Sequence, residues 1–445
     1  MIATPSYKSV VFKEPHEASG IIFGKHGNLL VCSPENAEEH GIAIGRTGIG
    51  KTLAILVLTL LNWIGTFFTI DIAGDISKNV LIPNKLVYEP ENASSTPFYI
   101  FAEIDSIVND DKRNELLLNL AYLIMPDNKR DGSVSIFYKS EGRKILAASL
   151  IALYSKRLDF IEICQKIISS SWEDLFAEIV KCNIPKADLL ITSFIGAKPE
   201  NTAGCKQVLD KAITLFSFGS SLAKNIRRPK PGETYFSPDQ LEALSVFIVI
   251  KDRMLNVYAP VLHIITAQVL SYMSTRENYP KCKILLALDE LSSCGKLDLL
   301  HSIQTLRKKG VRILALTQSI TDLDLVYGRD ERRAIMDNFA FNMILSCDDQ
   351  ENAELFSKKI GERTVVKTHL SKSRRMVPVK KRIPYEPLEY TTLRIEETIT
   401  KHPYEFKERI VPPDELSRLG DDLILLTPDG YMRLKKNFPP RDSIQ

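Results

Sequence analysis

Eight consecutive residues near the N-terminus have the composition and spacing of a phosphate-binding loop. They fit the pattern G-x-x-x-x-G-K-[ST] and are Gly45, Arg46, Thr47, Gly48, Ile49, Gly50, Lys51 and Thr52. Glycines let successive backbone N–H groups converge on phosphate oxygens, and the N-terminus of a following helix adds favourable partial charge. We expect Lys51 to reach the β and γ phosphates and the Thr52 hydroxyl to ligate magnesium. ATP and Mg²⁺ are therefore the expected cofactors.

A second segment supplies carboxylates. The apolar run from Ile284 to Leu288 ends in Asp289 and Glu290. We expect Asp289 to hold the magnesium ion through water and Glu290 to polarise the attacking water. An apolar strand that ends in two acids is weak evidence alone, but together with the phosphate loop it predicts a Mg-dependent, ATP-hydrolysing enzyme.

Two further residues are candidates for catalytic roles. Gln318 follows the apolar run 312–317 and would sense the γ phosphate, although it could also be only a polar strand end. Arg307 lies between the strand that ends at Asp289 and the strand 312–317. It could reach the γ phosphate of a neighbouring subunit in a ring as an arginine finger. A basic helix end that complements the helix dipole is the simpler alternative. The other candidates for the finger are Arg312, Arg332 and Arg333.

One segment, 367–382, concentrates positive charge and contains no acid. The whole chain carries 58 Lys and Arg against 55 Asp and Glu, a net charge of +3, and without the basic residues of this segment it would carry −4. Such a cluster gains affinity for phosphates by releasing counterions, and with little aromatic material it favours backbone contact over base reading. Ordinary solvated charge, a pore loop and an exposed hairpin are the alternatives. The nucleic-acid candidates are Lys367, Lys372, Arg374, Arg375, Lys380, Lys381 and Arg382.

The elements that must position these residues are short apolar runs separated by helical stretches. The runs are continuous rather than alternating, as expected for a parallel sheet covered on both faces. The uncharged run Leu53 to Phe68 has 16 residues, fewer than the ~18 of a spanning helix, and predicts a core helix, a turn and a strand. The predicted strands are 41–44, 67–72, 246–251, 283–288, 312–317, 342–346 and 423–427.

Between about residues 110 and 218 the apolar spacing becomes helical, and Ser171 is placed to cap a helix. The 237 residues that separate Thr52 from Asp289 exceed what a nucleotide-binding domain needs, and a helical insertion accounts for the excess. The sequence therefore predicts an α/β fold with a mostly parallel central sheet, interrupted by an all-α domain. The predicted boundaries are 1–109 and 233–445 for the nucleotide-binding domain and 110–232 for the insertion.

Composition is that of an ordinary globular protein. Of 445 residues, 44% are apolar and 25% charged, which excludes fibrous and disordered classes. The seven cysteines form no C-x-x-C pair, and this scatter is typical of a reducing compartment.

Taken in order, these residues resemble the coupling-protein ATPases of type IV secretion and conjugation, the TraG/TraD-like family of RecA and FtsK-like P-loop motors. The resemblance extends from about residue 20 to about residue 434. Besides the phosphate loop, it rests on Gly41, Thr59-Leu60-Leu61-Asn62-Trp63, Ile70-Asp71-Ile72-Ala73-Gly74-Asp75, Leu288-Asp289-Glu290, Leu316-Thr317-Gln318-Ser319, Tyr327-Gly328, Asn338 and Gly361-Glu362-Arg363-Thr364.

The resemblance implies a RecA-like nucleotide-binding domain, an inserted all-α domain, and a chain that is a homo-hexamer when active and a monomer in isolation. It implies single-stranded DNA, a relaxase or relaxosome and inner-membrane secretion components as partners, and a cytoplasmic or peripheral inner-membrane location. It also supports the roles assigned to Lys51, Thr52, Asp289, Glu290, Gln318 and Arg307.

Two departures from the family pattern leave questions open. Ala73 stands where members commonly carry Lys, and no segment reads as the usual N-terminal membrane helices. The chain is therefore either a soluble member or the cytoplasmic portion of a longer protein. Three functions compete: a motor that moves single-stranded DNA, a platform on which the helical insertion docks protein substrates or a relaxase, and a double-stranded DNA translocase of the FtsK type.

Overall fold

The computed structural model describes residues 8–127, 132–218, 220–382, 384–385 and 389–439. Contacts divide the chain into two compact units. One comprises residues up to Ser346 together with those from Leu419, and the other is Cys347–Arg418.

The first unit is built on a twelve-stranded sheet of order β1-β3-β2-β14-β13-β10-β4-β9-β8-β5-β7-β6. Neighbours from β10 to β6 are all parallel, whereas the strands from β1 to β10 pair antiparallel. The strands are β1 (Val11–Lys13), β2 (Ile22–His26), β3 (Leu29–Cys32), β4 (His40–Ile44), β5 (Thr66–Asp71), β6 (Lys85–Tyr88), β7 (Ser245–Val249), β8 (Ile284–Leu288), β9 (Val311–Thr317), β10 (Phe339–Ile344), β13 (Asp422–Thr427) and β14 (Gly430–Lys435).

All seven predicted strands are present, and the central ones are buried along their whole length. Strands β4, β5, β7, β8 and β9 have no residue with more than slight exposure, because helices cover both faces of the sheet. The prediction missed β1, β2, β3, β6 and β14, which lie toward the two edges of the sheet. These strands are short, and their apolar pattern is too brief to stand out from the surrounding turns.

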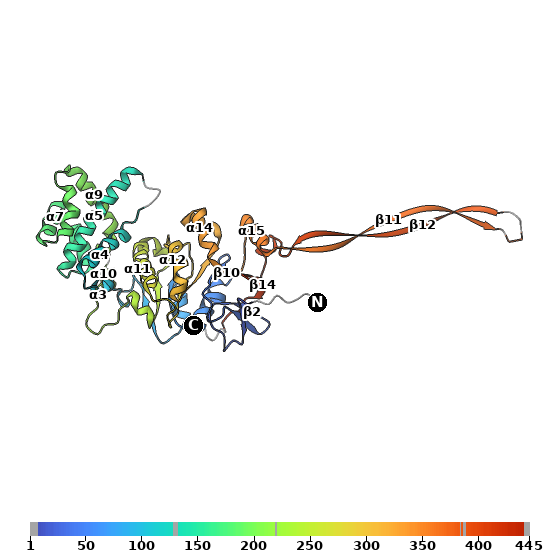
Figure 1. Ribbon diagram of the computed structural model, residues 1–445, viewed down its shortest axis with the longest axis horizontal. Helices are drawn as coiled ribbons and strands as arrows, with labels where there is room; N and C mark the ends of the chain where they lie inside the picture. Colours follow the sequence, from blue (N-terminus) through green and yellow to red (C-terminus); the bar gives the residue numbers. More distant parts are fainter. Residues whose placement is uncertain (1–7, 128–131, 219, 383, 386–388, 440–445) are drawn as a thin grey trace. The chain divides into compact units, whose positions relative to one another are not determined.

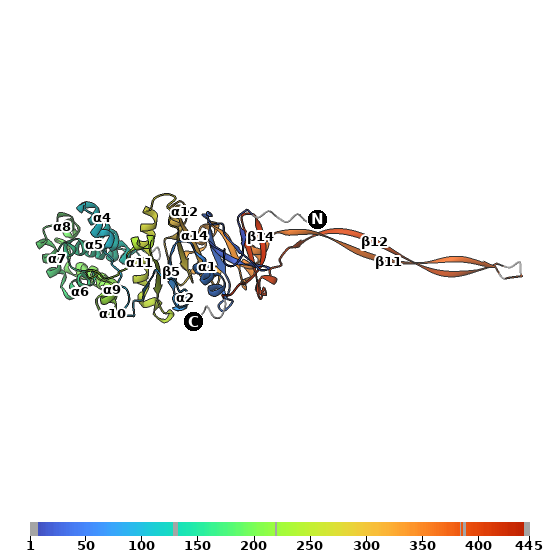
Figure 2. The same ribbon diagram turned by 90° about the horizontal axis from the view of Figure 1, so that it is seen from below.

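Helices of the first unit follow the strands along the chain and pack against the sheet. Figure 1 and Figure 2 both show α11 between the sheet and the helical insertion. The helices of this unit outside the insertion are the π-helix η1 (Thr52–Val57), α1 (Leu58–Asn62), α2 (Asp75–Asn79), α3 (Ala102–Ser106), η3 (Pro238–Glu242), η4 (Asp252–Met254), α11 (Leu255–Thr275), α12 (Leu299–Leu306), η5 (Arg307–Lys309), α13 (Ile320–Tyr327) and α14 (Arg329–Asp337).

One helical stretch in the described part of the chain, Asp252–Thr275, is long and apolar enough to cross a membrane by length and composition. The run Leu53 to Phe68 instead forms a helix, a turn and strand β5, as predicted. In Asp252–Thr275, Ile265 and Val269 are fully buried, and Gln268 donates a hydrogen bond to the Ile100 carbonyl at 3.0 Å. Its apolar surface is thus partly used in packing within the fold.

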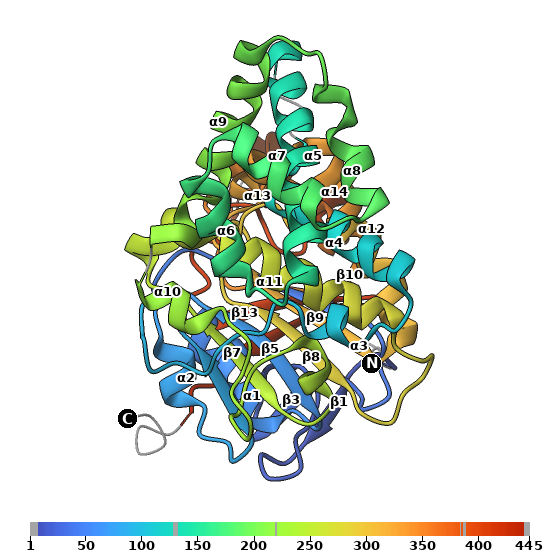
Figure 3. The same ribbon diagram turned by 90° about the vertical axis from the view of Figure 1, so that its left-hand side faces the viewer.

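The helical insertion is built around α5, which contacts α4, α6, α8 and α9. Figure 3 shows these helices gathered at one end of the unit. At Gly142 of α5 the backbone of α9 comes so close that a Cβ would stand 2.8 Å from the Cys205 carbonyl oxygen. The predicted cap is confirmed, since Ser171 Oγ accepts from the Asp174 N–H at 3.1 Å. The helices are α4 (Asp110–Ile124), α5 (Ser133–Ser155), α6 (Phe160–Ser169), α7 (Trp172–Lys181), α8 (Pro185–Ile191), η2 (Thr192–Phe194), α9 (Pro199–Phe218) and α10 (Ser220–Asn225).

The predicted fold class is therefore confirmed: an α/β fold with a mostly parallel sheet and a helical insertion. The insertion and the sheet belong to one compact unit, and the domain boundaries 110–232 stay a prediction.

The second unit consists of α15 (Gln350–Ile360), η6 (Glu415–Ser417) and a hairpin of two 21-residue strands, β11 (Glu362–Arg382) and β12 (Glu389–Arg409). The two strands pair antiparallel without a register shift, from Glu362 opposite Arg409 to Arg382 opposite Glu389. Strands of this length extend for about 70 Å. Segment 367–382 is thus part of an exposed hairpin, and its contact with nucleic acid stays a prediction.

Candidate nucleotide-binding site

The phosphate loop follows β4 at the carboxyl end of the parallel strands. Gly48 and Gly50 have φ angles of +77° and +95°, which side chains other than glycine rarely adopt. At Gly45 a Cβ would stand 3.0 to 3.2 Å from Ile49, Leu345 and Ser346, so a side chain at this position would force its neighbours to shift. Within the loop, the Arg46 N–H donates to Ser346 and the Ile49 N–H to the Arg46 carbonyl, and we expect other loop N–H groups to face phosphate oxygens.

Lys51 is buried beneath this loop. Its Nζ donates to the carbonyl oxygens of Gly45 and, at 3.3 Å, Arg46. Burial lowers the pKa of Lys51, and the carboxylates of Glu290 and Asp289 partly oppose that shift. The ammonium group thus sits where phosphate oxygens would give it anionic partners.

Thr52 and Asp289 meet although 237 residues separate them. The Thr52 hydroxyl donates to Asp289 Oδ1 at 2.8 Å, which brings the loop and the end of β8 together. Burial raises the pKa of Asp289 to about 6, while the Thr52 hydrogen bond lowers it and nearby Asp71 and Glu290 raise it further. A carboxylate that shares a buried site with other acids is stabilised by a cation.

These oxygens fit magnesium. Mg²⁺ prefers hard oxygen ligands and is commonly bound by one or two protein groups together with phosphate oxygens and waters. Thr52 and Asp289 would hold the ion, and the ion would neutralise charge on the phosphates. Within the described residues, no group of three or more His, Cys, Asp or Glu side chains is placed to hold a metal by itself.

Glu290 lies beside Asp289 and is half-buried. Ser292 donates a hydrogen bond to Glu290 Oε1 at 2.7 Å, which orients the carboxylate. Burial raises the pKa of Glu290, and the Ser292 hydrogen bond and Lys51 oppose the shift. Gln318 is exposed at the end of the neighbouring strand β9. The structure thus brings Lys51, Thr52, Asp289, Glu290 and Gln318 together at the carboxyl ends of the central parallel strands.

The arginine candidates differ in availability. Arg312 is buried and donates to the Pro34 and Glu35 carbonyls, and Arg332 pairs with Asp324 at 2.8 Å. Both are committed to the fold. Arg307 precedes β9, at the end of the strand opposite Gln318, and pairs with Glu39 at 3.2 Å across a partly exposed contact.

Arg307 and the phosphate loop of its own chain therefore lie at opposite ends of the parallel strands β9 and β4. Arg333 is also exposed. The assignment of the finger stays a prediction.

Three contributors were not found from the sequence. Ser346 accepts from the Arg46 N–H at 2.9 Å, and Asp71, at the end of β5, accepts from the N–H groups of Gly74 and Ser77 at 2.8 Å each. Ser292 is the third. Serines at strand ends carry no motif, but the position of Asp71 at the end of a predicted strand beside β8 was a usable signal.

The seven predicted nucleic-acid residues all lie on β11 and are exposed. The register places acids of β12 opposite some of them: Arg374 pairs with Glu397 at 2.5 Å, and Arg375 lies opposite Glu396. β11 has eight Lys and Arg and one Glu, and β12 has four Lys and Arg and five Glu, so the strands keep a net charge of +6. The basic segment is partly compensated, which the sequence pattern did not indicate.

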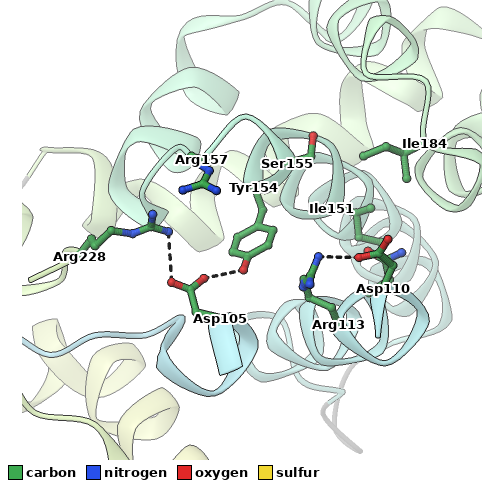
Figure 4. Close-up of a pocket in the computed structure, with 10 residues that line it drawn as sticks. Asp105, Asp110, Arg113, Ile151, Tyr154, Ser155, Arg157, Ile184 and Arg228 are labelled. Atoms are coloured by element: carbon green, nitrogen blue, oxygen red, sulfur yellow. Dashed lines mark hydrogen bonds and ion pairs between the residues drawn. The ribbon is translucent and has the colours of Figure 1, made fainter. Parts of the chain in front are cut away.

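A separate pocket of about 570 Å³ lies at the base of the helical insertion (Figure 4). Asp105 of α3 accepts from the Tyr154 hydroxyl at 2.6 Å, pairs with Arg228 at 3.4 Å, and also accepts from Tyr99. Asp105 and Arg228 lie on the segments by which the chain enters and leaves the insertion. The hydrogen bonds and the ion pair of Asp105 thus connect the insertion to the nucleotide-binding part. None of the motif residues lines this pocket.

A family model described as "Type IV secretory system Conjugative DNA transfer" matches residues 7–435. The chain belongs to this family. It is 22% identical over 368 residues to the conjugal transfer protein TraG of Agrobacterium fabrum (strain C58), with 77% of this chain and 54% of TraG covered. It is 21% identical over 373 residues to the coupling protein VirD4 of Bartonella quintana, with 79% and 58% covered. The chain spans little more than half the length of these relatives.

Solved structures of a member of this conjugative transfer family share the fold. The conjugative coupling protein TrwB in its unbound form (TrwBdeltaN70) matches with a TM-score of 0.65 and 18% identity, covering 91% of this chain and 85% of TrwB. TrwB in complex with ADP and Mg²⁺ matches with a TM-score of 0.66, covering 92% and 88%. The predicted family is therefore confirmed.

Proposed function

We propose that this chain is the ATP-hydrolysing motor of a type IV secretion coupling protein, which recruits a relaxase–DNA complex and drives transfer of single-stranded DNA. The observation that carries the proposal is the contact of Thr52 with Asp289, with Lys51 and Glu290 at the same edge of the sheet. These are the parts that phosphoryl transfer to water requires. The structure of TrwB with ADP and Mg²⁺ supports the same ligands for this fold.

In this mechanism each residue has a separate task. The loop N–H groups and Lys51 hold the phosphates and offset their charge, and Thr52 and Asp289 fix the magnesium ion. Glu290, oriented by Ser292, accepts a proton from the attacking water. Its raised pKa brings the carboxylate closer to the operating pH, which favours a general base.

The test measures ATP binding and turnover in the parent protein, Lys51→Ala and Glu290→Gln, with and without single-stranded DNA. We expect Lys51→Ala to lose binding and Glu290→Gln to bind ATP without turning it over. Retained turnover in Glu290→Gln would refute the assigned base. Absence of stimulation by any nucleic acid would contradict the DNA motor, and stimulation by duplex alone would indicate a double-stranded DNA translocase.

The hairpin is the proposed DNA contact. Its strands keep a net positive charge and expose Lys372 opposite Ile399, so phosphates can approach this lysine. Lys372→Gln should reduce the slope of log affinity against log salt by about 0.7, the value for one phosphate contact on a single strand. Lys181→Gln, at an exposed position at the end of α7 in the helical insertion, is the control and should leave the slope unchanged.

A second candidate, a docking platform for protein substrates or a relaxase, is favoured by the polar pocket at the base of the insertion. Stimulation of turnover by a relaxase but not by DNA would support it.

Mixed rings test the finger: Arg307→Ala subunits should regain turnover when assembled with Glu290→Gln subunits.

A further inference from the structure

The segment that follows β14 passes over the phosphate loop and places an aromatic ring on it. If Gly50 carried a Cβ, that atom would stand 2.7 Å from Phe438 Cε1 and 2.9 Å from Cζ. The ring therefore lies in direct contact with the second glycine of the loop. Phe438 is nevertheless 47% exposed, so a large part of the ring remains accessible next to the loop.

The ring is held in place by its neighbours in the chain. Lys436 is buried, its N–H donates to the Asp421 carbonyl at 2.8 Å, and its Nζ donates to the Gly420 carbonyl at 2.6 Å. Pro439, on the other side, is also buried. The chain is thus anchored on both sides of Phe438, at Lys436 and Pro439, while the ring itself lies outside the core.

The strand order indicates which end of a nucleotide would meet this ring. Asp289 and Glu290 follow β8, which lies beyond β9 on one side of β4, and they mark the γ-phosphate end of the site. β10, β13 and β14 lie on the other side of β4, and Phe438 follows β14. A nucleotide whose phosphates cross the loop toward the acids has its ribose and base on the side of Phe438.

We propose that Phe438 is the platform on which the base of the bound nucleotide stacks. The inference rests on the proposed nucleotide binding and adds the residue that holds the base. Stacking on a ring is tolerant of base identity, because every base has a π face. The platform therefore predicts similar gains in affinity for adenine and guanine nucleotides.

The experiment measures equilibrium binding of ATP, GTP and inorganic tripolyphosphate, each with Mg²⁺, to the parent protein, Phe438→Ala and Phe438→Tyr. Removal of a stacked aromatic ring should weaken ATP and GTP binding about tenfold and leave tripolyphosphate binding unchanged. Phe438→Tyr keeps the ring and should keep the parent affinities. Unchanged ATP binding in Phe438→Ala would overturn the platform, as would equal weakening of ATP and tripolyphosphate, which would show that the ring only supports the loop.

Lys51→Ala separates this inference from the proposed function. If tripolyphosphate binds the parent and not Lys51→Ala, the phosphate site is established, and the Phe438 variants decide the platform alone. If tripolyphosphate does not bind the parent, or binds Lys51→Ala equally well, the proposed nucleotide site is wrong and the platform falls with it.

Discussion

Replacement of Asp289 by asparagine should stabilise the nucleotide-free protein while it abolishes Mg-dependent turnover. The carboxylate shares its site with Asp71 and Glu290, and its burial raises the pKa from 3.8 to about 6. A pKa that is higher in the folded than in the unfolded state favours folding at low pH. That contribution is fully present below pH 3.8 and is lost as the pH rises through about 6.

The magnitude follows from the same shift. Each pKa unit corresponds to about 1.4 kcal/mol, so ionised Asp289 lowers the free energy of unfolding by about 3 kcal/mol at pH 8 relative to pH 3. Asparagine has no such cost, because it has no charge and can still accept the hydrogen bond from Thr52 through its side-chain oxygen. The gain in stability should therefore be near zero at pH 3, about 1 kcal/mol at pH 4.5 and about 3 kcal/mol at pH 8.

The assay is urea unfolding at a series of pH values in the presence of a chelator, so that no cation compensates the carboxylate. Asp348→Asn is the matched control, because Asp348 is also an aspartate that follows a parallel strand but is exposed. A stability gain that is absent at pH 8, or that does not vary between pH 4.5 and pH 8, would refute the reasoning. Excess Mg²⁺ should reduce the difference between the parent and Asp289→Asn.

Two further predictions concern the fold. Arg312→Met should lower the free energy of unfolding by about 2 to 4 kcal/mol, because three acceptors at Ser33, Pro34 and Glu35 lose their buried donor, and equal urea midpoints would contradict this. Gly142→Ala should cost about 1 to 3 kcal/mol by forcing α5 from α9, measured by urea unfolding. Gly132→Ala, where a Cβ would meet nothing within 4 Å, is its control, and equal costs in both variants would show that close packing is not the cause.

The sequence was sufficient to predict the centre of the fold and to select residues that lie together at the carboxyl ends of the parallel strands. β4, β8 and β9 are rich in consecutive apolar residues, and each is followed directly by a motif residue, so their position and their role could be inferred together. Side-chain partners such as Ser292 could not be found, because a single serine at a strand end has no distinctive spacing. The charge of segment 367–382 was overestimated for a different reason. The acids that oppose it lie on β12 and become neighbours only through strand register.

Two segments are added to the sheet: the helical insertion and the second unit, Cys347–Arg418. The residues at which the chain leaves and re-enters the sheet for each addition bear on how such a protein can vary. Ile344 of β10 and Ile424 of β13 are paired residues of adjacent strands, and Cys347–Arg418 occupies the chain between them. In the same way, Phe98, which precedes the helical insertion, forms β-bridges to Ile226 and Phe236, which both follow it.

Each addition thus begins and ends at backbone that is already held together, so its length contributes little to the entropy of closing the sheet. Insertions at these two junctions can be lengthened, exchanged or removed over evolution, while the registers that hold Lys51 near Asp289 are preserved.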